Sequence, residues 1–324
     1  MVEIFLGTDL SFGLKMWPET DRWLNIVKNY LGLDVIEFNS DFLDPLFNDT
    51  NEYMEVAKEI YQACKENNIE INNYFTGEMT HCVNFITHPD ERLRKGGIKW
   101  CKGAIDIAST MGARAIGSNF NNIPSYICND KFLYKKTIDY LMSTLSDLTR
   151  YSKGKNLEFL LWEQMYSPSE VPYTIEQTKK YFEKLNSISS LPVKLVIDVG
   201  HACCQNFKHL EDDADPYRWI EECGYLAEVI HLQQTDGLAS RHWPFTKEYN
   251  KKGIIFPELI LKSIEKADID KIYLIFEIFF PLEVNEKTVL SEMVETVKYW
   301  RKFLSKYAEE VRHDKEKVDR EEKT

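Results

Sequence analysis

The chain has 324 residues, 44% of them hydrophobic, and a formal net charge of −12. This length suits one large α/β domain or two modest ones. The acidic balance argues against a nucleic-acid partner, which needs a basic face, and no apolar run reaches the roughly 18 residues of a membrane span.

Two features favour a cytoplasmic protein. The N-terminus, Met1 to Phe5, lacks the basic and apolar regions of a signal peptide and resembles a first strand. The seven cysteines are scattered, and no two of them form a C-x-x-C pair. Reduced thiols are therefore expected.

Eight short apolar segments are predicted to be strands. They are often β-branched, as expected of buried parallel strands, and helix-length intervals separate them. The segments are residues 3–6, 35–38, 70–75, 114–117, 158–162, 194–197, 228–232 and 272–276.

Several intervals carry helix signals. Thr50 is a candidate cap for a helix whose apolar residues recur at spacings of three and four. Pro89 and Asp215-Pro216 precede further helices, because proline and acidic residues favour a first turn. The last predicted helix starts near Glu286.

This alternation predicts an α/β fold, the (β/α)8 TIM barrel. A doubly wound open sheet is the alternative, but no G-x-G-x-x-G follows the first strand. No Pro/Gly/Ser-rich linker divides the chain, so one domain is expected over residues 1–310. Residues 311–324 are nearly all charged and are expected to form a disordered tail.

Four of the predicted strands end in groups that can bind a metal ion. The C-terminal ends of barrel strands form the active-site face, so consecutive ends can converge there. Closely spaced carboxylates are tolerated when a divalent cation neutralises them. The groups are Glu163, Asp198 with His201 three residues on, His231 with Gln233 two residues on, and Glu277.

Three carboxylates with one nitrogen or amide oxygen suit a single Mn²⁺, Mg²⁺ or Co²⁺ ion, and Zn²⁺ less well. His231 and Gln233 face the same side of a strand, because side chains alternate along it. One of the two is enough to complete the site, and the other would then contact substrate or the ligands.

The segment 235–245 is a long loop that contains Arg241 and His242. It is either a lid over a small polar ligand or an exposed loop whose aromatic residues pack locally. Small polar or basic residues elsewhere could bind hydroxyls or a phosphate. They are Thr8, Lys15, Asn39, Thr76, Gly77, Ser118 and Asn119.

These motifs resemble those of the xylose isomerase-like barrel family of sugar and sugar-phosphate isomerases and epimerases. The resemblance covers nearly the whole chain, and the D-erythrulose-1-phosphate 3-epimerase group is the most similar subgroup. The family motifs are Thr76-Gly77 with His88-Pro89-Asp90, Trp162-Glu163, Asp198-Val199-Gly200-His201, His231-Leu232-Gln233-Gln234-Thr235 and Phe276-Glu277. The subgroup is indicated by Leu6-Gly7-Thr8, Leu43-Asp44-Pro45 and the segments 215–220, 245–250 and 253–255.

The resemblance implies roles for the strand-end residues. Glu163 and Glu277 would both bind the metal and exchange the proton, while Asp198 and Gln233 would be ligands only. His201 would bind substrate, and His231 would lie beside it. The epimerases carry an arginine soon after the fourth ligand, where this chain has Arg241 only further on, with His242 beside it.

The implied reaction is epimerisation at C3 of a small ketose or ketose phosphate through a cis-enediolate. An aldose–ketose or hydroxypyruvate-type isomerase is the main alternative, and a non-catalytic sugar-binding relative is a second. An abasic-site endonuclease would need histidines where this chain has Asn73 and Ser118. The expected partner is a small sugar, with no nucleic acid or membrane and with a homo-oligomer possible.

Overall fold

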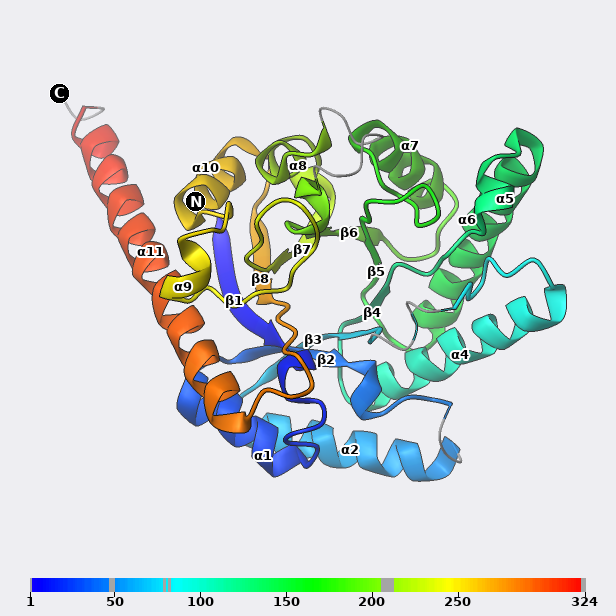
Figure 1. Cartoon of the computed structure of the whole chain (residues 1–324), viewed down its shortest axis with the longest axis horizontal. Coiled ribbons are helices and arrows are strands. Elements are labelled where there is room, and N and C mark those ends of the chain that lie inside the picture. Colours follow the sequence, from blue (N-terminus) through cyan, green and yellow to red (C-terminus); the bar gives the residue numbers. More distant parts are fainter. Residues whose placement is uncertain (1, 47–49, 78–79, 81–82, 205–212, 322–324) are drawn as a thin grey trace.

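The computed structural model describes residues 2–46, 50–77, 80, 83–204 and 213–321. Eight parallel strands pair in sequence order and form a closed barrel (Figure 1). Closure comes from β1 and β8, which pair from Glu3 with Lys271 to Thr8 with Phe276. The strands are β1 (Glu3–Asp9), β2 (Val35–Asn39), β3 (Glu70–Phe75), β4 (Ala115–Ser118), β5 (Phe159–Glu163), β6 (Val193–Asp198), β7 (Ala227–Leu232) and β8 (Lys271–Phe276).

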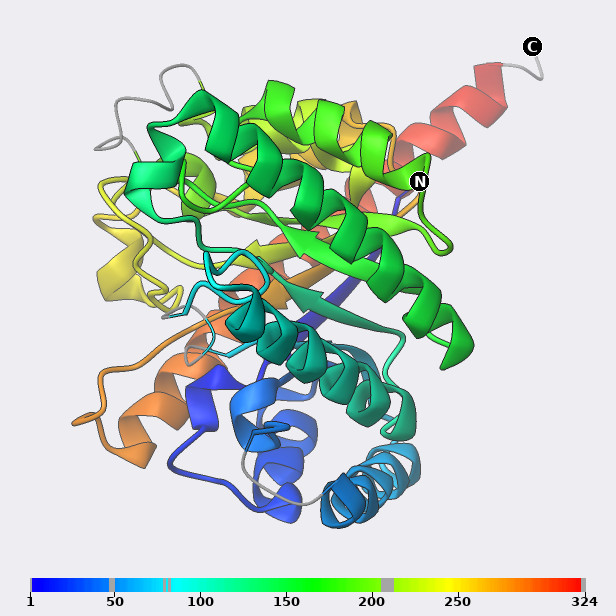
Figure 2. The ribbon, with the colours of Figure 1, turned by 90° about the vertical axis from the view of Figure 1, so that its right-hand side faces the viewer.

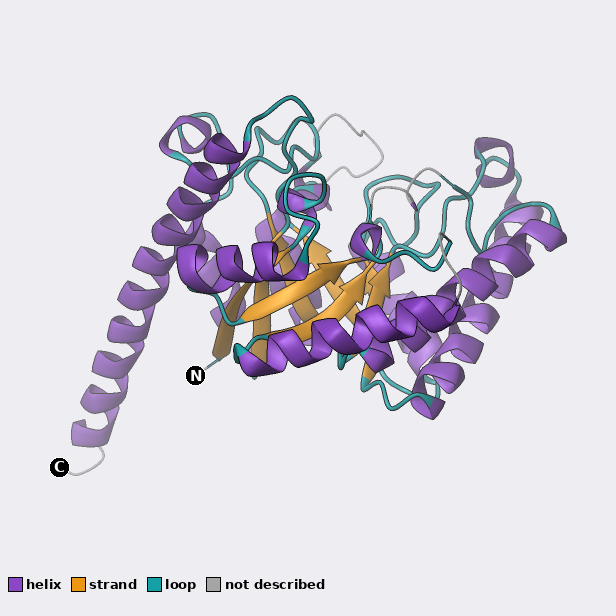
Figure 3. Ribbon diagram, turned by 90° about the horizontal axis from the view of Figure 1, so that it is seen from below, coloured by secondary structure: helices purple, strands orange, loops and turns teal. Residues whose placement is uncertain are grey.

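All eight predicted strands are therefore confirmed to within a few residues at their ends, and closure rules out the open-sheet alternative. Helices cover the outside of the barrel, and Figure 3 shows longer loops gathered beyond the arrowheads of the strands. The helices are α1 (Thr20–Asn25), α2 (Thr50–Glu66), α4 (Glu91–Thr110), α5 (Ser125–Cys128), α6 (Lys131–Gly154), α7 (Ile175–Asn186), α8 (Pro216–Cys223), α9 (Lys247–Asn250), α10 (Pro257–Lys266) and α11 (Glu286–Glu321).

Aspartate caps begin two of the predicted helices. Asp215 accepts hydrogen bonds from the backbone N–H groups of Tyr217 and Arg218, and Pro216 occupies the first turn of α8. Asp90 caps α4 through the N–H of Arg92. These side chains satisfy N–H groups that have no partner inside the helix.

The charged C-terminal segment differs from the expectation. We expected residues 311–324 to lack regular structure, but α11 continues to Glu321, and its end extends away from the barrel in Figures 1 and 2. Glu, Lys and Arg have high helix propensity, so a segment without an apolar stripe can still prolong a helix that is already formed.

The barrel interior is apolar near the N-terminal ends of the strands and polar near their C-terminal ends. Side chains alternate along each strand, so an apolar residue and the polar residue two positions later face the same side. Val196 precedes Asp198 in this way, and Ile275 precedes Glu277. The apolar layer consists of Val35, Phe75, Ala115, Phe159, Leu161, Val196, Val229, Tyr273 and Ile275.

No helix among the described residues is long and apolar enough to cross a membrane. Of the seven cysteines in the sequence, Cys82 lies outside the described residues. The other six are free thiols, which agrees with the expectation for them.

Candidate metal centre

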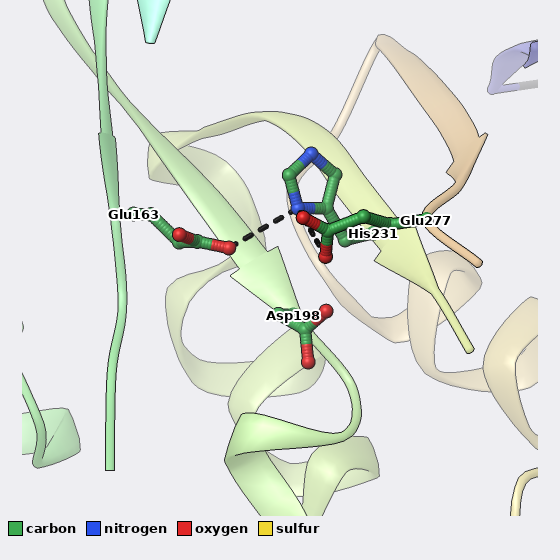
Figure 4. Close-up of side chains that lie close together, drawn as sticks. All are labelled: Glu163, Asp198, His231 and Glu277. Carbon is green, nitrogen blue, oxygen red and sulfur yellow. Dashed lines mark hydrogen bonds and ion pairs between the residues drawn. The ribbon is translucent and has the colours of Figure 1, made fainter. Parts of the chain in front are cut away.

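Four strand-end groups converge at the C-terminal face of the barrel. Glu163, Asp198, His231 and Glu277 each offer one ligand atom, and these atoms lie within 4.8 Å of one another (Figure 4). They come from β5, from the end of β6, from β7 and from the residue after β8. All four side chains are buried. The sequence singled out each of these residues, and the structure brings them together.

His231 lies between the two glutamates. Its Nδ1 is 3.1 Å from Oε1 of Glu163 and 3.3 Å from Oε2 of Glu277. On the other side of the ring, Nε2 is 2.9 Å from Oε1 of Glu37. His231 is fully buried and is not among the residues that line the cavity described below.

Gln233 lies beside Asp198 and directs its amide nitrogen toward it. Nε2 donates to both carboxylate oxygens of Asp198, at 2.9 and 3.0 Å. Oε1 accepts the backbone N–H groups of Arg241 and His242, at 2.9 and 2.6 Å. Two N–H donors fix which end of the amide is oxygen. The oxygen that would bind a metal therefore faces the loop after β7.

The two glutamates have opposite pKa shifts. Burial raises the pKa of Glu277 well above its usual range, and the nearby His231 only partly offsets this. Burial would also raise the pKa of Glu163, but the hydrogen bond from His231 and the charge of His201 outweigh it and leave the pKa below its usual value. One carboxyl group thus favours its proton, while the other favours its charge.

Asp198 is held in its charged form. Burial opposes ionisation, but His201, His242 and His231 together lower the pKa of Asp198 to about 2. Its Oδ1 also accepts the backbone N–H of His201 at 2.7 Å, across the turn at Gly200, where a Cβ atom would lie 2.2 Å from the side chain of Gln233. A permanently charged carboxylate in a buried position is a suitable cation ligand.

A cavity of about 550 Å³ opens above the two glutamates. His201 and His242 both line it. Burial lowers the pKa of His242 to about 4, so this side chain is neutral near pH 7. The lining residues are Thr76, Gly77, Asn122, Glu163, Met165, Tyr166, Glu170, His201, Ser240, His242, Glu277 and Phe279.

Arg241 is not among the lining residues of the cavity. Its guanidinium donates to both carboxylate oxygens of Asp236 at 3.1 Å and lies over the ring of Trp243. The loop after β7 thus combines both expected forms. His242 reaches the site, whereas Arg241 packs locally.

Two acidic residues near the site were not singled out from the sequence. Glu37 lies inside β2, and burial raises the pKa of Glu170, which lines the cavity after β5. Glu37 follows Val35 by two positions, the same inward-facing spacing that joins Val196 to Asp198. That spacing could have identified Glu37 once the phase of the strand was known.

The donor set fits a divalent cation. Three carboxylates and one imidazole nitrogen are gathered in a buried site, where like charges repel strongly. Oε2 of Glu277 is buried and makes no hydrogen bond of standard geometry, although an imidazole nitrogen lies 3.3 Å away. Hard oxygen donors with one nitrogen are ligands that Mn²⁺, Mg²⁺, Co²⁺ and Zn²⁺ accept.

Comparison with known proteins agrees with this architecture. The family model for the xylose isomerase-like TIM barrel matches residues 25–301. D-erythrulose 1-phosphate 3-epimerase of Brucella abortus (strain 2308) is 23% identical over 298 residues, which are 91% of this chain and 95% of that protein.

Solved structures show the same fold. A Rhodospirillum rubrum ATCC 11170 protein, provisionally described as a xylose isomerase, is 26% identical with a TM-score of 0.85, over 92% of this chain and 98% of that one. An L-ribulose 3-epimerase is 18% identical with a TM-score of 0.67, over 98% of each chain.

A closed (β/α)8 barrel with groups that could hold a metal ion at its strand ends is an arrangement found in barrel enzymes. The chain belongs to the xylose isomerase-like TIM-barrel family. Its relatives are isomerases and epimerases, and it is an enzyme of that class.

Proposed function

We propose that this protein is a metal-dependent epimerase that inverts C3 of a small ketose or ketose phosphate. The observation that carries the proposal is the pair Glu163 and Glu277, which line one cavity and have pKa values shifted in opposite directions. Opposed shifts in neighbouring carboxyl groups are typical of an acid/base pair. The similarity to D-erythrulose 1-phosphate 3-epimerase supports a substrate of this kind.

Glu163 and Glu277 divide the proton transfers. Glu163 is charged and serves as the base that removes the C3 proton. Glu277 returns a proton to the opposite face of the enediolate, which inverts the centre. A bound divalent cation would polarise the C2 carbonyl. Two carboxyl groups are needed because a single one would return the proton to the face from which it came.

Glu163, Asp198 and Glu277 are the proposed carboxylate ligands, and strand β7 supplies the fourth. Nδ1 of His231 lies among the carboxylates but donates a hydrogen bond to Glu163, so His231 would bind the cation only after giving up that proton. Gln233, the fourth ligand implied by the family resemblance, would first have to release the N–H groups of Arg241 and His242 and turn its amide over. His201 and His242, which line the cavity, are the proposed substrate-binding residues.

Solvent hydrogen exchange tests the reaction. The protein, loaded with Mn²⁺, is incubated in D₂O with erythrulose 1-phosphate and with free ketoses, and the sugars are analysed by NMR. Deuterium at C3 together with a new 3-epimer is the expected result. Label at C1 or C2 with an aldose product would instead establish the isomerase alternative. Gln233 is compatible with that alternative, because hydroxypyruvate isomerases have a glutamine as the fourth ligand. No label at C3 would overturn the epimerase proposal.

A further inference from the structure

Glu37 is a buried carboxylate that the reaction proposed above does not use. It lies inside β2, one inward-facing position above Val35, and is fully buried. Its Oε1 is 2.9 Å from Nε2 of His231. These two atoms form an ion pair without meeting strict hydrogen-bond angles, and neither makes a hydrogen bond to any other described residue.

Glu37 is itself held in place. Its second oxygen, Oε2, accepts a hydrogen bond of 2.8 Å from Nδ2 of Asn73 on the neighbouring strand β3. The register of β2 against β3 shifts between Ile36 and Glu37, and this irregularity is located where the carboxylate enters the barrel interior. Asn73 is fully buried as well, so the carboxylate has a fixed partner on each oxygen.

The ring of His231 is thereby oriented. Phe75 packs edge-on against it, with the ring centroids 5.0 Å apart. With Nε2 facing Glu37, Nδ1 faces Glu163 at 3.1 Å and Glu277 at 3.3 Å. A ring flipped about its Cβ–Cγ bond would turn a C–H group toward the glutamates and leave Oε1 of Glu37 without a partner, which is costly in a buried site.

We propose that Glu37 is a positioning residue that fixes His231 through Nε2 and so holds its Nδ1 against the carboxylates of Glu163 and Glu277, two of the proposed cation ligands. The inference rests on the proposed function only in requiring a divalent cation at this cluster. Carboxylates that bind metals are commonly held by hydrogen-bonding partners outside the ligand set, and loss of such a partner weakens metal binding.

Calorimetric titration of the metal-free full-length chain with Mn²⁺ tests this role without any substrate. Glu37→Gln keeps the shape of the side chain and can still accept the hydrogen bond from Asn73, but its amide then turns N–H groups toward Nε2. We expect this variant to bind Mn²⁺ about 10- to 100-fold more weakly. Glu228→Gln is the matched control. It neutralises another buried glutamate, 6% exposed, that pairs with Arg114 and Lys194, and we expect unchanged Mn²⁺ affinity.

A double-mutant cycle with His231→Asn shows whether Glu37 acts through His231. Residues that act as one unit have non-additive effects, so Glu37→Gln should cause little further loss in the His231→Asn background. Unchanged Mn²⁺ affinity of Glu37→Gln, or the same loss with and without His231, would overturn the proposal. If the wild type binds Mn²⁺ but exchanges no C3 hydrogen, the proposed reaction fails and Glu37 keeps its role. Absence of Mn²⁺ binding by the wild type would overturn both.

Discussion

At the residue scale, Glu163 and Glu277 are close in space but differ in their preferred charge. Burial acts on both, and the difference comes from the neighbours, because His231 and His201 lower the pKa of Glu163 while burial prevails at Glu277. In the proposed reaction, the two proton-transfer roles would therefore be set by local surroundings rather than by residue type.

Glu277→Gln removes the proposed proton donor with little change in shape. We expect kcat for C3 epimerisation to fall by about 10²- to 10⁴-fold, the usual contribution of one acid/base group. The measurement is the steady-state rate at saturating Mn²⁺ and sugar. Circular dichroism and Mn²⁺ titration provide the control, since the substitution also replaces a metal ligand. A variant that binds Mn²⁺ and retains more than about a tenth of wild-type kcat would contradict the donor role.

Asp9 gives the chain a specific dependence of stability on pH. Burial and the nearby Glu37 raise the pKa of Asp9 to about 7. The unfolded chain releases this proton near pH 4, so between about pH 4 and 7 the unfolded state binds fewer protons and stability falls as pH rises. Each unit of pKa difference corresponds to about 1.4 kcal/mol, so the full effect is on the order of a few kcal/mol.

Asp9→Asn should remove this dependence. Relative to the wild type, the variant should gain free energy of unfolding as pH rises from about 4 to 7 and gain no more above that. Urea unfolding at a series of pH values measures the difference. A difference between variant and wild type that stays constant across this range would show that Asp9 has an ordinary pKa in the folded state.

The strand ends could be predicted at the residue scale because the signal is local. An apolar run followed by a carboxylate or imidazole identified Glu163, Asp198, His231 and Glu277. Glu37 was missed because it lies within a strand, where its inward direction depends on the phase of β2 in the closed barrel. The orientation of the Gln233 amide could not be predicted either, because the backbone N–H groups of residues 241 and 242 determine it.

At the scale of elements, β7 and its following loop act together. Val229, His231 and Gln233 face the barrel interior in succession, since alternate residues share a side. The loop returns to the strand end when Gln234 and Trp243 pair with each other through two backbone hydrogen bonds. This pairing carries His242 into the cavity and leaves Arg241 with Asp236. The sequence indicated the loop but left both of its forms open, because only the pairing distinguishes them.

The start of α8 illustrates how local sequence determines an element. Asp215 accepts two backbone N–H groups, and Pro216 follows it in the first turn. Asp215→Ala should lower the free energy of unfolding by about 1 kcal/mol, because those N–H groups lose their partner. Asp215→Asn, whose side-chain oxygen can still accept, should stay close to the wild type. Equal destabilisation by Ala and Asn in urea unfolding would show that charge, not capping, stabilises this helix.

At the scale of the whole molecule, the two ends of the barrel have different tasks. The C-terminal end carries the Glu163, Asp198, His231 and Glu277 cluster and the cavity, whereas ion pairs lie near the beginnings of the strands at the opposite end. Arg114, just before β4, donates to Glu158 at 2.9 Å and to Glu228 at 3.0 Å. In this fold, residues at the C-terminal end of the barrel generally serve function, and residues at the other end generally serve stability.

Arg114 therefore offers a test of that division. Its side chain is 22% exposed, and its guanidinium lies over Phe159 and Tyr273, so it joins four strands through charge and packing. Arg114→Met keeps much of the apolar contact but leaves Glu228, whose side chain is 8% exposed, with Lys194 as its remaining cation. We expect the free energy of unfolding to fall by on the order of 2 kcal/mol, less than for a fully buried pair.

Mn²⁺ affinity and kcat, measured well below the melting temperature, should not change, because the apolar layer separates this network from the ligand cluster. A loss of Mn²⁺ affinity in a variant that remains folded would mean that the two ends of the barrel are coupled.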